Sequence, residues 1–186
     1  MKRGKKMKIT VLTGSPHKKG TTALLTEKFI EGAEKNGHEI KKIDTAFLEV
    51  KPCLACDYCI AHEGRCVQKD DMDKVREGVM KADMVVLSTP VYYFGMSAQI
   101  KAAIDRFYAF NDDLLKMKKK SVLISACGDE EEWVPEAIEK HYETICRYLN
   151  WTPEGVLVAR GVYTREDIEK TDYPAQAQKL GEKVRD

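Results

Sequence analysis

Short apolar runs alternate with amphipathic helical stretches along the whole of this 186-residue chain. Strands are predicted at 8–14, 38–46, 83–93, 120–128 and 154–162, and helices near 21–36, 70–82, 97–110, 134–149 and 173–185. Strands that are apolar on both faces belong in a parallel sheet with helices on both sides. The pattern therefore predicts an α/β fold, a three-layer sandwich around a five-stranded, parallel, doubly wound sheet.

Individual residues predict where some of these elements end. Gly37 falls where a helix C-cap would lie, and either Asp70 or Asp71 is placed to cap the helix that follows it. Pro90 is expected to end the third strand. The 38–46 run alternates only loosely, which predicts a more exposed strand.

Composition and charge limit the classes of partner. Hydrophobic residues make up 43% of the chain and charged residues 33%, as in an ordinary soluble protein, and we expect one domain over 1–186 with a disordered basic tail at 1–6. A net charge of +1 gives no reason to expect nucleic acid or a membrane as a partner. The N-terminus lacks an export signal, so a reducing, cytoplasmic location is expected.

The loop after the first strand is rich in groups that bind phosphate. It reads "TGSPHKKGTT" (13–22) and leads directly into a helix, so backbone N–H groups, hydroxyls and the positive end of the helix dipole meet there. The candidate phosphate ligands are Ser15, His17, Gly20, Thr21 and Thr22. The alternative is a plain strand-to-helix turn with a hydroxyl cap.

The motifs of other proteins with this topology are missing from the loop. There is no G-x-x-x-x-G-K-[ST] run for a nucleoside triphosphate and no G-x-G-x-x-G run for a dinucleotide. The loop also lacks the cysteine of a thiolate phosphatase and the acidic metal ligands of a receiver domain.

A second loop completes a family resemblance. The segment "STPVYYFGMSAQIKAAIDRF" (88–107) follows the third strand, and together with "GSPHKKGTT" it resembles the NAD(P)H-dependent FMN reductases of the flavodoxin-like superfamily. The similarity extends over most of the chain. It implies a flavodoxin-like fold and an oxidoreductase that reduces FMN, a quinone or a similar acceptor with NAD(P)H.

The resemblance also implies a set of flavin contacts. The 15–22 residues named above would hold the FMN phosphate, and the isoalloxazine would lie against Pro90, Val91, Tyr92, Tyr93 and Phe94, with Cys127 and Gly128 at a further edge. Tyr92, Tyr93 and Phe94 could instead fill the core or form a dimer contact. Lys101, Asp105 and Arg106 are interpreted as helix-surface or interface residues.

In such a family the flavin carries the chemistry, so no catalytic side chain is expected. The implied partners are a nicotinamide nucleotide and a small electron acceptor, which use the same ring face in turn. The resemblance further implies a homodimer or homotetramer.

Four of the six cysteines form a compact C-x2-C-x2-C-x6-C run, comprising Cys53, Cys56, Cys59 and Cys66. The first three resemble the bacterial ferredoxin motif, and a run at this position is also typical of the iron–sulfur flavoproteins, a branch of the same superfamily. The resemblance implies a [4Fe–4S] cluster near the flavin, passing single electrons to FMN from a ferredoxin-like carrier.

Other interpretations of the cysteine run remain open. The thiols could be free or redox-active, hold zinc or form a disulfide, and the protein could then be a non-enzymatic electron shuttle or a thiol/zinc module. Cys127 and Cys146 are expected to be buried thiols, and His38, His62 and His141 surface residues.

Overall fold

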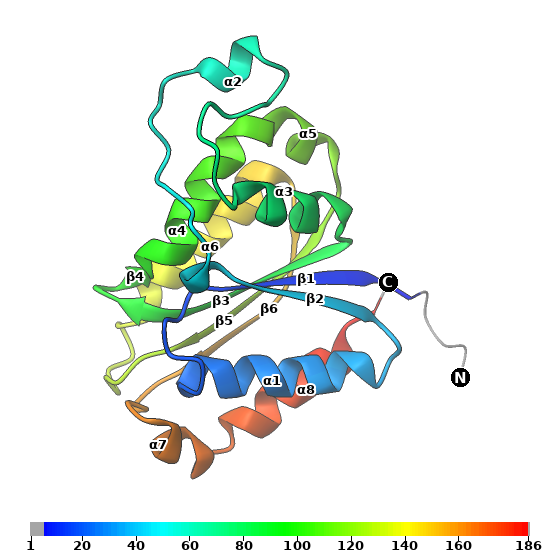
Figure 1. Ribbon diagram of the computed structural model, residues 1–186. Helices are drawn as coiled ribbons and strands as arrows, with labels where there is room; N and C mark the ends of the chain where they lie inside the picture. The colour runs from blue at the N-terminus through cyan, green and yellow to red at the C-terminus, as the bar shows by residue number, and fades with distance from the viewer. Residues whose placement is uncertain (1–5, 186) are drawn as a thin grey trace.

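The computed structural model describes residues 6–185, which form a parallel sheet between two layers of helices (Figure 1). The parallel strands are β1 (Lys8–Thr13), β2 (Glu39–Asp44), β3 (Met84–Tyr92), β5 (Lys120–Ala126) and β6 (Thr152–Ala159). They lie in the order β2-β1-β3-β5-β6, and the two-residue β4 (Gly95–Met96) pairs antiparallel with the end of β3. This is the flavodoxin-like strand order, so the predicted doubly wound sheet is confirmed. Apart from Lys6, the tail expected at 1–6 lies outside the described residues.

Helices cover both faces of the sheet (Figure 1). One face carries α1 (Thr21–Glu34), α7 (Arg165–Glu169) and α8 (Tyr173–Lys183). The other carries α3 (Met72–Lys81), α4 (Ala98–Asp105), the 3₁₀ helix η2 (Arg106–Phe110), α5 (Asn111–Lys116) and α6 (Glu136–Leu149). None of the helices in residues 6–185 is both long and apolar enough to cross a bilayer.

The central strand β3 supplies side chains to both cores. Met84 and Val86 pack among the residues under α1 and α8, whereas Val85 and Leu87 pack among those under α3, α4 and α6. All four side chains are fully buried. Successive side chains of a strand point to opposite faces, which explains why this run is apolar without interruption.

Helices α1 and α8 touch through two glycines. A Cβ at Gly32 would collide with the backbone carbonyl oxygen of Gln178, and a Cβ at Gly181 would collide with that of Phe29. The two helix backbones therefore approach closely, and this contact fixes α1, whose first turn faces the site described below.

The predicted ends of the elements are only partly right. Gly37 adopts φ +81°, as a residue that terminates a helix does. Asp71 holds the N-cap position of α3, but its carboxylate accepts from the backbone N–H of Glu49 instead of capping the helix. The prediction that Pro90 ends the third strand is wrong: β3 continues to Tyr92 because pairing with β4 begins directly after the proline.

Several short elements were not predicted. The helix expected at 97–110 is α4 followed by the 3₁₀ turn η2, and α5 comes next. The 3₁₀ helix η1 (Thr45–Phe47) follows β2, and the cysteine segment then leaves the sheet and forms α2 (Tyr58–Ala61). Figure 1 shows this segment projecting beyond α4 and α5, at the far end of that helical layer.

Candidate functional site: a flavin pocket and a four-cysteine cavity

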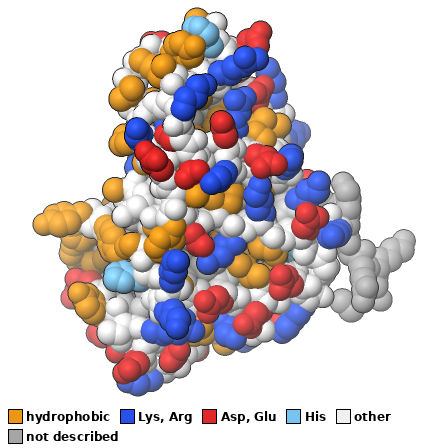
Figure 2. Space-filling view, in the orientation of Figure 1, with side chains coloured by type: hydrophobic (Ala, Val, Ile, Leu, Met, Phe, Trp, Pro, Cys, Tyr) orange, Lys and Arg blue, Asp and Glu red, His pale blue; other side chains and the backbone are white. Residues whose placement is uncertain are grey.

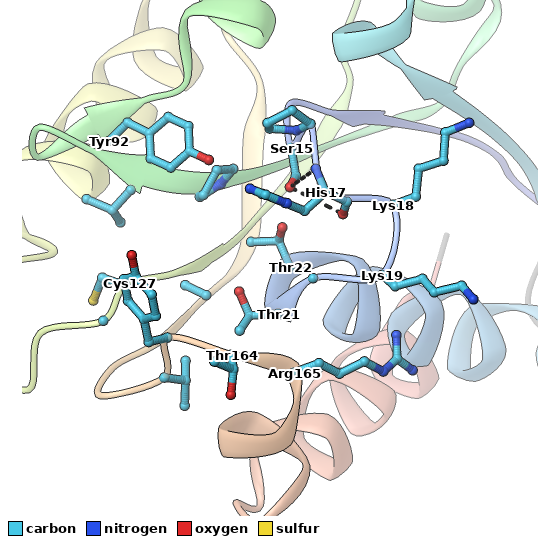
Figure 3. Close-up of a pocket in the computed structure, with 18 residues that line it drawn as sticks. Ser15, His17, Lys18, Lys19, Thr21, Thr22, Tyr92, Cys127, Thr164 and Arg165 are labelled. Carbon is cyan, nitrogen blue, oxygen red and sulfur yellow. Dashed lines mark hydrogen bonds between the residues drawn. The ribbon is translucent and has the colours of Figure 1, made fainter.

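A pocket of about 750 Å³ opens at the carboxyl ends of the parallel strands (Figure 3). It lies beside the adjacent strands β1 and β3, after which the chain continues into helices on opposite faces of the sheet. This is the usual ligand position in an open α/β sheet. Of the twelve residues predicted to contact a flavin, ten line it: Ser15, His17, Gly20, Thr21, Thr22, Pro90, Val91, Tyr92, Cys127 and Gly128.

The first turn of α1 forms one end of this pocket. Gly20 is its N-cap residue and has extended backbone, and no side chain among the described residues caps the free N–H groups that follow it. Figure 3 shows Thr21 and Thr22 at this turn, with their hydroxyls toward the pocket. Unpaired amides, hydroxyls and the helix dipole together make a site for a phosphate group.

Local hydrogen bonds shape the loop that precedes α1. The Ser15 Oγ accepts from the His17 N–H at 3.1 Å, and the Gly20 N–H donates to the His17 carbonyl oxygen at 3.1 Å. The loop also needs Gly14, because a Cβ there would lie 2.5 Å from the Ser97 Oγ. That hydroxyl donates to the Gly14 carbonyl oxygen at 2.7 Å and so ties the loop to the start of α4.

The basic side chains beside the pocket are mostly engaged elsewhere. Lys18 lies over the ring of Phe47 at 4.5 Å, and Figure 3 shows Lys18 and Lys19 extending away from the pocket. Arg165 pairs with Glu169 at 2.8 Å. The attraction for an anion therefore comes chiefly from the amides and hydroxyls of α1 rather than from cationic side chains.

The aromatic loop after β3 is a tight hairpin, and only part of it lines the pocket. Tyr93 and Phe94 occupy its turn with φ of +46° and +64°, the left-handed values of a type I′ turn. Tyr92 lines the pocket, whereas Tyr93 is fully exposed and Phe94 packs on Trp133 with 5.2 Å between ring centroids. Tyr93 and Phe94 therefore do not line this pocket, and the flavin contact expected for them stays a prediction.

Cys127 and Gly128 form the edge supplied by β5. Burial raises the pKa of the Cys127 thiol, and its Sγ donates weakly to the Asp129 carbonyl oxygen at 3.5 Å. The group is therefore a neutral thiol at pH 7, suited to packing rather than to nucleophilic attack.

Sequence reasoning missed the wall of the pocket that follows β6. Val162, Tyr163, Thr164 and Arg165 line it. Thr164 begins α7 with a capping box, in which its Oγ accepts from the Asp167 N–H and the Asp167 carboxylate accepts from the Thr164 N–H. The "TRED" pattern directly after a predicted strand was a signal that could have located this loop.

The four clustered cysteines line a second, separate cavity. Cys53, Cys56, Cys59 and Cys66 share it with Arg106 and Tyr108, and it has no lining residue in common with the flavin pocket. Its volume of about 20 Å³ is roughly that of one water molecule. Within residues 6–185, no three metal-binding side chains are arranged to hold a single ion. A [4Fe–4S] cluster spaces its thiolates more widely, because each binds a different iron atom.

The cysteine segment is wound tightly around that cavity. Ala55, Asp57 and Glu63 all have positive φ, a conformation that costs a non-glycine residue on the order of 1 kcal/mol. The segment is anchored by hydrogen bonds from the Gln68 Nε2 to the Pro52 carbonyl oxygen at 2.9 Å and from the Tyr108 hydroxyl to the Asp57 carboxylate at 3.1 Å. Cys53 and Cys56 are exposed, so the cavity is open toward solvent.

Arg106 forms the inner wall of the four-cysteine cavity, and its interpretation as a helix-surface residue is wrong. Its side chain is 2% exposed and its guanidinium pairs with the Asp70 carboxylate at 2.7 Å. Although burial by itself lowers it, the pKa of Arg106 is raised, because the Asp70 carboxylate and, less strongly, Cys66 favour the charged form. Lys101 and Asp105, by contrast, lie on the helix surface as expected, where they form an ion pair at 2.6 Å.

The other expectations for cysteine and histidine have mixed outcomes. Cys127 and Cys146 are buried, as predicted, and His62 is exposed. His38 is buried rather than at the surface, because its Nδ1 accepts from the Met7 N–H at 3.2 Å and its Nε2 contacts the Val184 carbonyl oxygen. His141 is half-buried.

A flavodoxin-like sheet, an uncapped helix turn after β1 and an aromatic hairpin after β3 are the features expected of a flavin-binding oxidoreductase. The chain belongs to the NADPH-dependent FMN reductase family, whose model matches residues 7–152. It is therefore an FMN-dependent oxidoreductase that uses NAD(P)H, as the sequence analysis expected.

Curated relatives add a second description. The chain is 30% identical over 183 residues to an iron–sulfur flavoprotein of Archaeoglobus fulgidus, covering 96% of this chain and 79% of that protein. A second iron–sulfur flavoprotein of the same organism is 41% identical over 100 residues, which cover 54% of this chain and 48% of that protein. The chain thus spans about half the length of the second relative.

The solved structures agree on the fold. An NAD(P)H:quinone oxidoreductase from Methanothermobacter marburgensis superimposes with a TM-score of 0.75, covering 96% of both chains. At 17% identity, this likeness shows the fold alone.

Proposed function

We propose that this chain acts as one flavodoxin-like domain that binds FMN in the 750 Å³ pocket and uses NAD(P)H to reduce a small electron acceptor. The observation that carries the proposal is the first turn of α1, where uncapped N–H groups and the Thr21 and Thr22 hydroxyls open into the pocket. The pocket volume lies within the usual range for small-molecule sites, so a flavin nucleotide fits the residues present.

In this arrangement the protein binds and orients, while FMN supplies the hydride and electron chemistry when bound. The Thr21 and Thr22 hydroxyls and the α1 amides hold the phosphate, and Pro90, Val91 and Tyr92 pack on one side of the ring system. Cys127 and Gly128 form the edge beside β5. No side chain is assigned an acid, base or nucleophile role.

The test of this function is the flavin absorbance of protein loaded with FMN under anaerobic conditions. Addition of NADPH or NADH should bleach the band within one turnover, and a quinone should restore it. A protein that binds FMN but is bleached by neither nucleotide would contradict the proposal.

A second function is favoured by the convergence of four cysteines on one cavity. We infer that Cys53, Cys56, Cys59 and Cys66 ligate a [4Fe–4S] cluster, as the name of the Archaeoglobus relative suggests. The cluster would exchange single electrons with FMN and with a ferredoxin-like carrier. The exposed outer side of the segment allows the chain to open around a group larger than the cavity.

Chemical analysis tests the cluster directly. Protein reconstituted without oxygen should contain about four iron and four sulfide per chain. Replacing any one of the four cysteines by serine should lower that content, whereas the matched control Cys146→Ser, a buried thiol outside the cavity, should not. Iron-free protein with four titratable thiols would leave only the flavin function.

We also propose that the chain forms a homodimer or homotetramer. Exposed apolar side chains gather at two places, the hairpin that carries Tyr93 and Phe94 and the segment that carries Leu54 and Ile60. Figure 2 shows hydrophobic surface over both, at the left edge and at the top of the view. Patches of this kind mark protein interfaces. Because the flavin pocket and the cysteine cavity are separate in one chain, an interface between copies would supply the electron route.

A further inference from the structure

The Arg106 guanidinium is held rigidly at the inner wall of the cysteine cavity. Its Nη1 donates to the Asp70 carboxylate at 2.7 Å and to the Lys51 carbonyl oxygen at 2.9 Å, and its Nη2 donates to the other Asp70 oxygen at 3.2 Å. These contacts engage both terminal nitrogens, Nη1 and Nη2, and so hold the guanidinium in one orientation.

One donor of this guanidinium has no partner. Within the described residues, the Arg106 Nε is buried and makes no hydrogen bond. A buried N–H without an acceptor costs about 1–3 kcal/mol, so such groups call for an explanation. Arg106 and the four cysteines, Cys66 among them, line the same cavity, so a cysteine sulfur is one acceptor close to this wall.

We propose that Arg106 is a positioning residue of the four-cysteine site, whose Nε–H donates to the Cys66 sulfur when that sulfur binds a [4Fe–4S] cluster. The proposal rests on the cluster proposed above. Reduction adds one negative charge to the cluster, and a fixed cation with an N–H···S bond stabilises that charge. Arg106 therefore raises the reduction potential of the cluster, and Asp70 holds it in place to do so.

The test compares the midpoint potential of the loaded protein in three forms. The double variant Arg106→Met/Asp70→Asn removes the donor and the buried ion pair together, so it leaves neither an unpaired charge nor a change in net charge. Its equilibrium constant for one-electron reduction should fall about tenfold, which for one electron is about 59 mV. Arg106→Lys keeps the charge but cannot donate to both Asp70 and Cys66, so its equilibrium constant for reduction should fall by less than that of the double variant.

Arg76 offers a matched control. It is a second arginine beside the segment, donating from its Nη1 to the Gly64 carbonyl oxygen at 3.0 Å, but it does not line the cavity. Arg76→Met should change the equilibrium constant by less than about twofold, because Arg76 does not line the cavity and its Nη1 is engaged by the Gly64 carbonyl oxygen.

Iron and sulfide content, measured on every sample, separates the possible outcomes. A loaded variant with a lowered potential supports the role of Arg106. If the double variant does not load, the comparison is made on Arg106→Lys. Loaded variants with the wild-type potential would overturn the role of Arg106 while leaving the cluster in place, and wild-type protein that takes up no iron would overturn both.

Discussion

Arg106 and Asp70 form a bidentate ion pair that is almost entirely enclosed by protein. The two bonds measure 2.7 and 3.2 Å, and the side chains are 2% and 1% exposed. The pair joins η2 to the residues just before α3, and the bond from Arg106 to the Lys51 carbonyl oxygen adds the start of the cysteine segment. One interaction thus fixes three parts of the chain that are far apart in sequence.

Breaking this pair from one side should strongly destabilise the fold. Asp70→Asn or Arg106→Met alone should lower the free energy of unfolding by about 3–5 kcal/mol, because each leaves a buried group uncompensated. The double variant should lose less than the sum of the two. Urea denaturation of the four proteins measures this coupling. Strictly additive losses would contradict it, and removal of the exposed Lys101–Asp105 pair serves as the control, with an expected loss below about 1 kcal/mol.

The Arg106–Asp70 pair should also make the free energy of unfolding depend on pH in the acid range. Although burial alone raises it, the pKa of Asp70 is below its usual value, because Arg106 and the N–H groups of Lys51 and Met72 stabilise the carboxylate. The contribution of Asp70 to the stability of the fold is therefore complete above its unfolded-state pKa, about 3.9. This contribution is lost as the pH falls through the lower folded-state pKa. Denaturation between pH 5 and 2 should show a steeper loss for wild type than for Asp70→Asn. Parallel curves would show that Asp70 does not titrate as described.

The phosphate end of the pocket should depend on the α1 hydroxyls. Thr21→Ala with Thr22→Ala should weaken FMN binding at least tenfold, since a lost hydrogen bond to a charged group costs about 1.5–3 kcal/mol. Fluorescence titration measures the affinity, and circular dichroism checks that the fold is intact. Thr144→Ala, an exposed helical position on α6, is the control. Unchanged FMN affinity in the double variant would show that the phosphate does not bind at this turn.

Tyr92 should shape the environment of the flavin without transferring a proton. It lines the pocket but is still about half exposed, so Tyr92→Phe should alter affinity modestly and keep most of the turnover. Steady-state kinetics with NADPH and a quinone test this. A loss of several orders of magnitude with FMN still bound would indicate an acid–base role instead. Tyr93→Phe, at the exposed tip of the hairpin, should change neither quantity.

Local patterns explain why the fold, and the residues that line much of the pocket, could be predicted from sequence. The apolar runs of β1, β3 and β5 and the helical periodicity between them depend only on neighbouring residues. The turn at 15–22, proposed to bind the phosphate, is likewise contiguous, and it lies at the switch point because of the strand order.

Long-range partners explain what the sequence could not predict. Arg106 follows α4 in a charged stretch that is typical of a helix surface, and its partner Asp70 lies 36 residues earlier. His38 is buried only because residues near both ends of the chain, Met7 and Val184, enclose it. Tyr93 and Phe94 do not line the pocket because they occupy a two-residue turn, which the sequence analysis did not anticipate.

The relative affinity of the protein for FMN and riboflavin is the most direct measurement of the proposed site. The two ligands share the ring system and differ by the phosphate, which in this structure would meet the uncapped first turn of α1. With at least two hydrogen bonds to that charged group, FMN should bind roughly 100-fold more tightly or better. Equal affinities in a calorimetric titration would show that the turn holds no phosphate, and would contradict the assignment of this pocket to FMN.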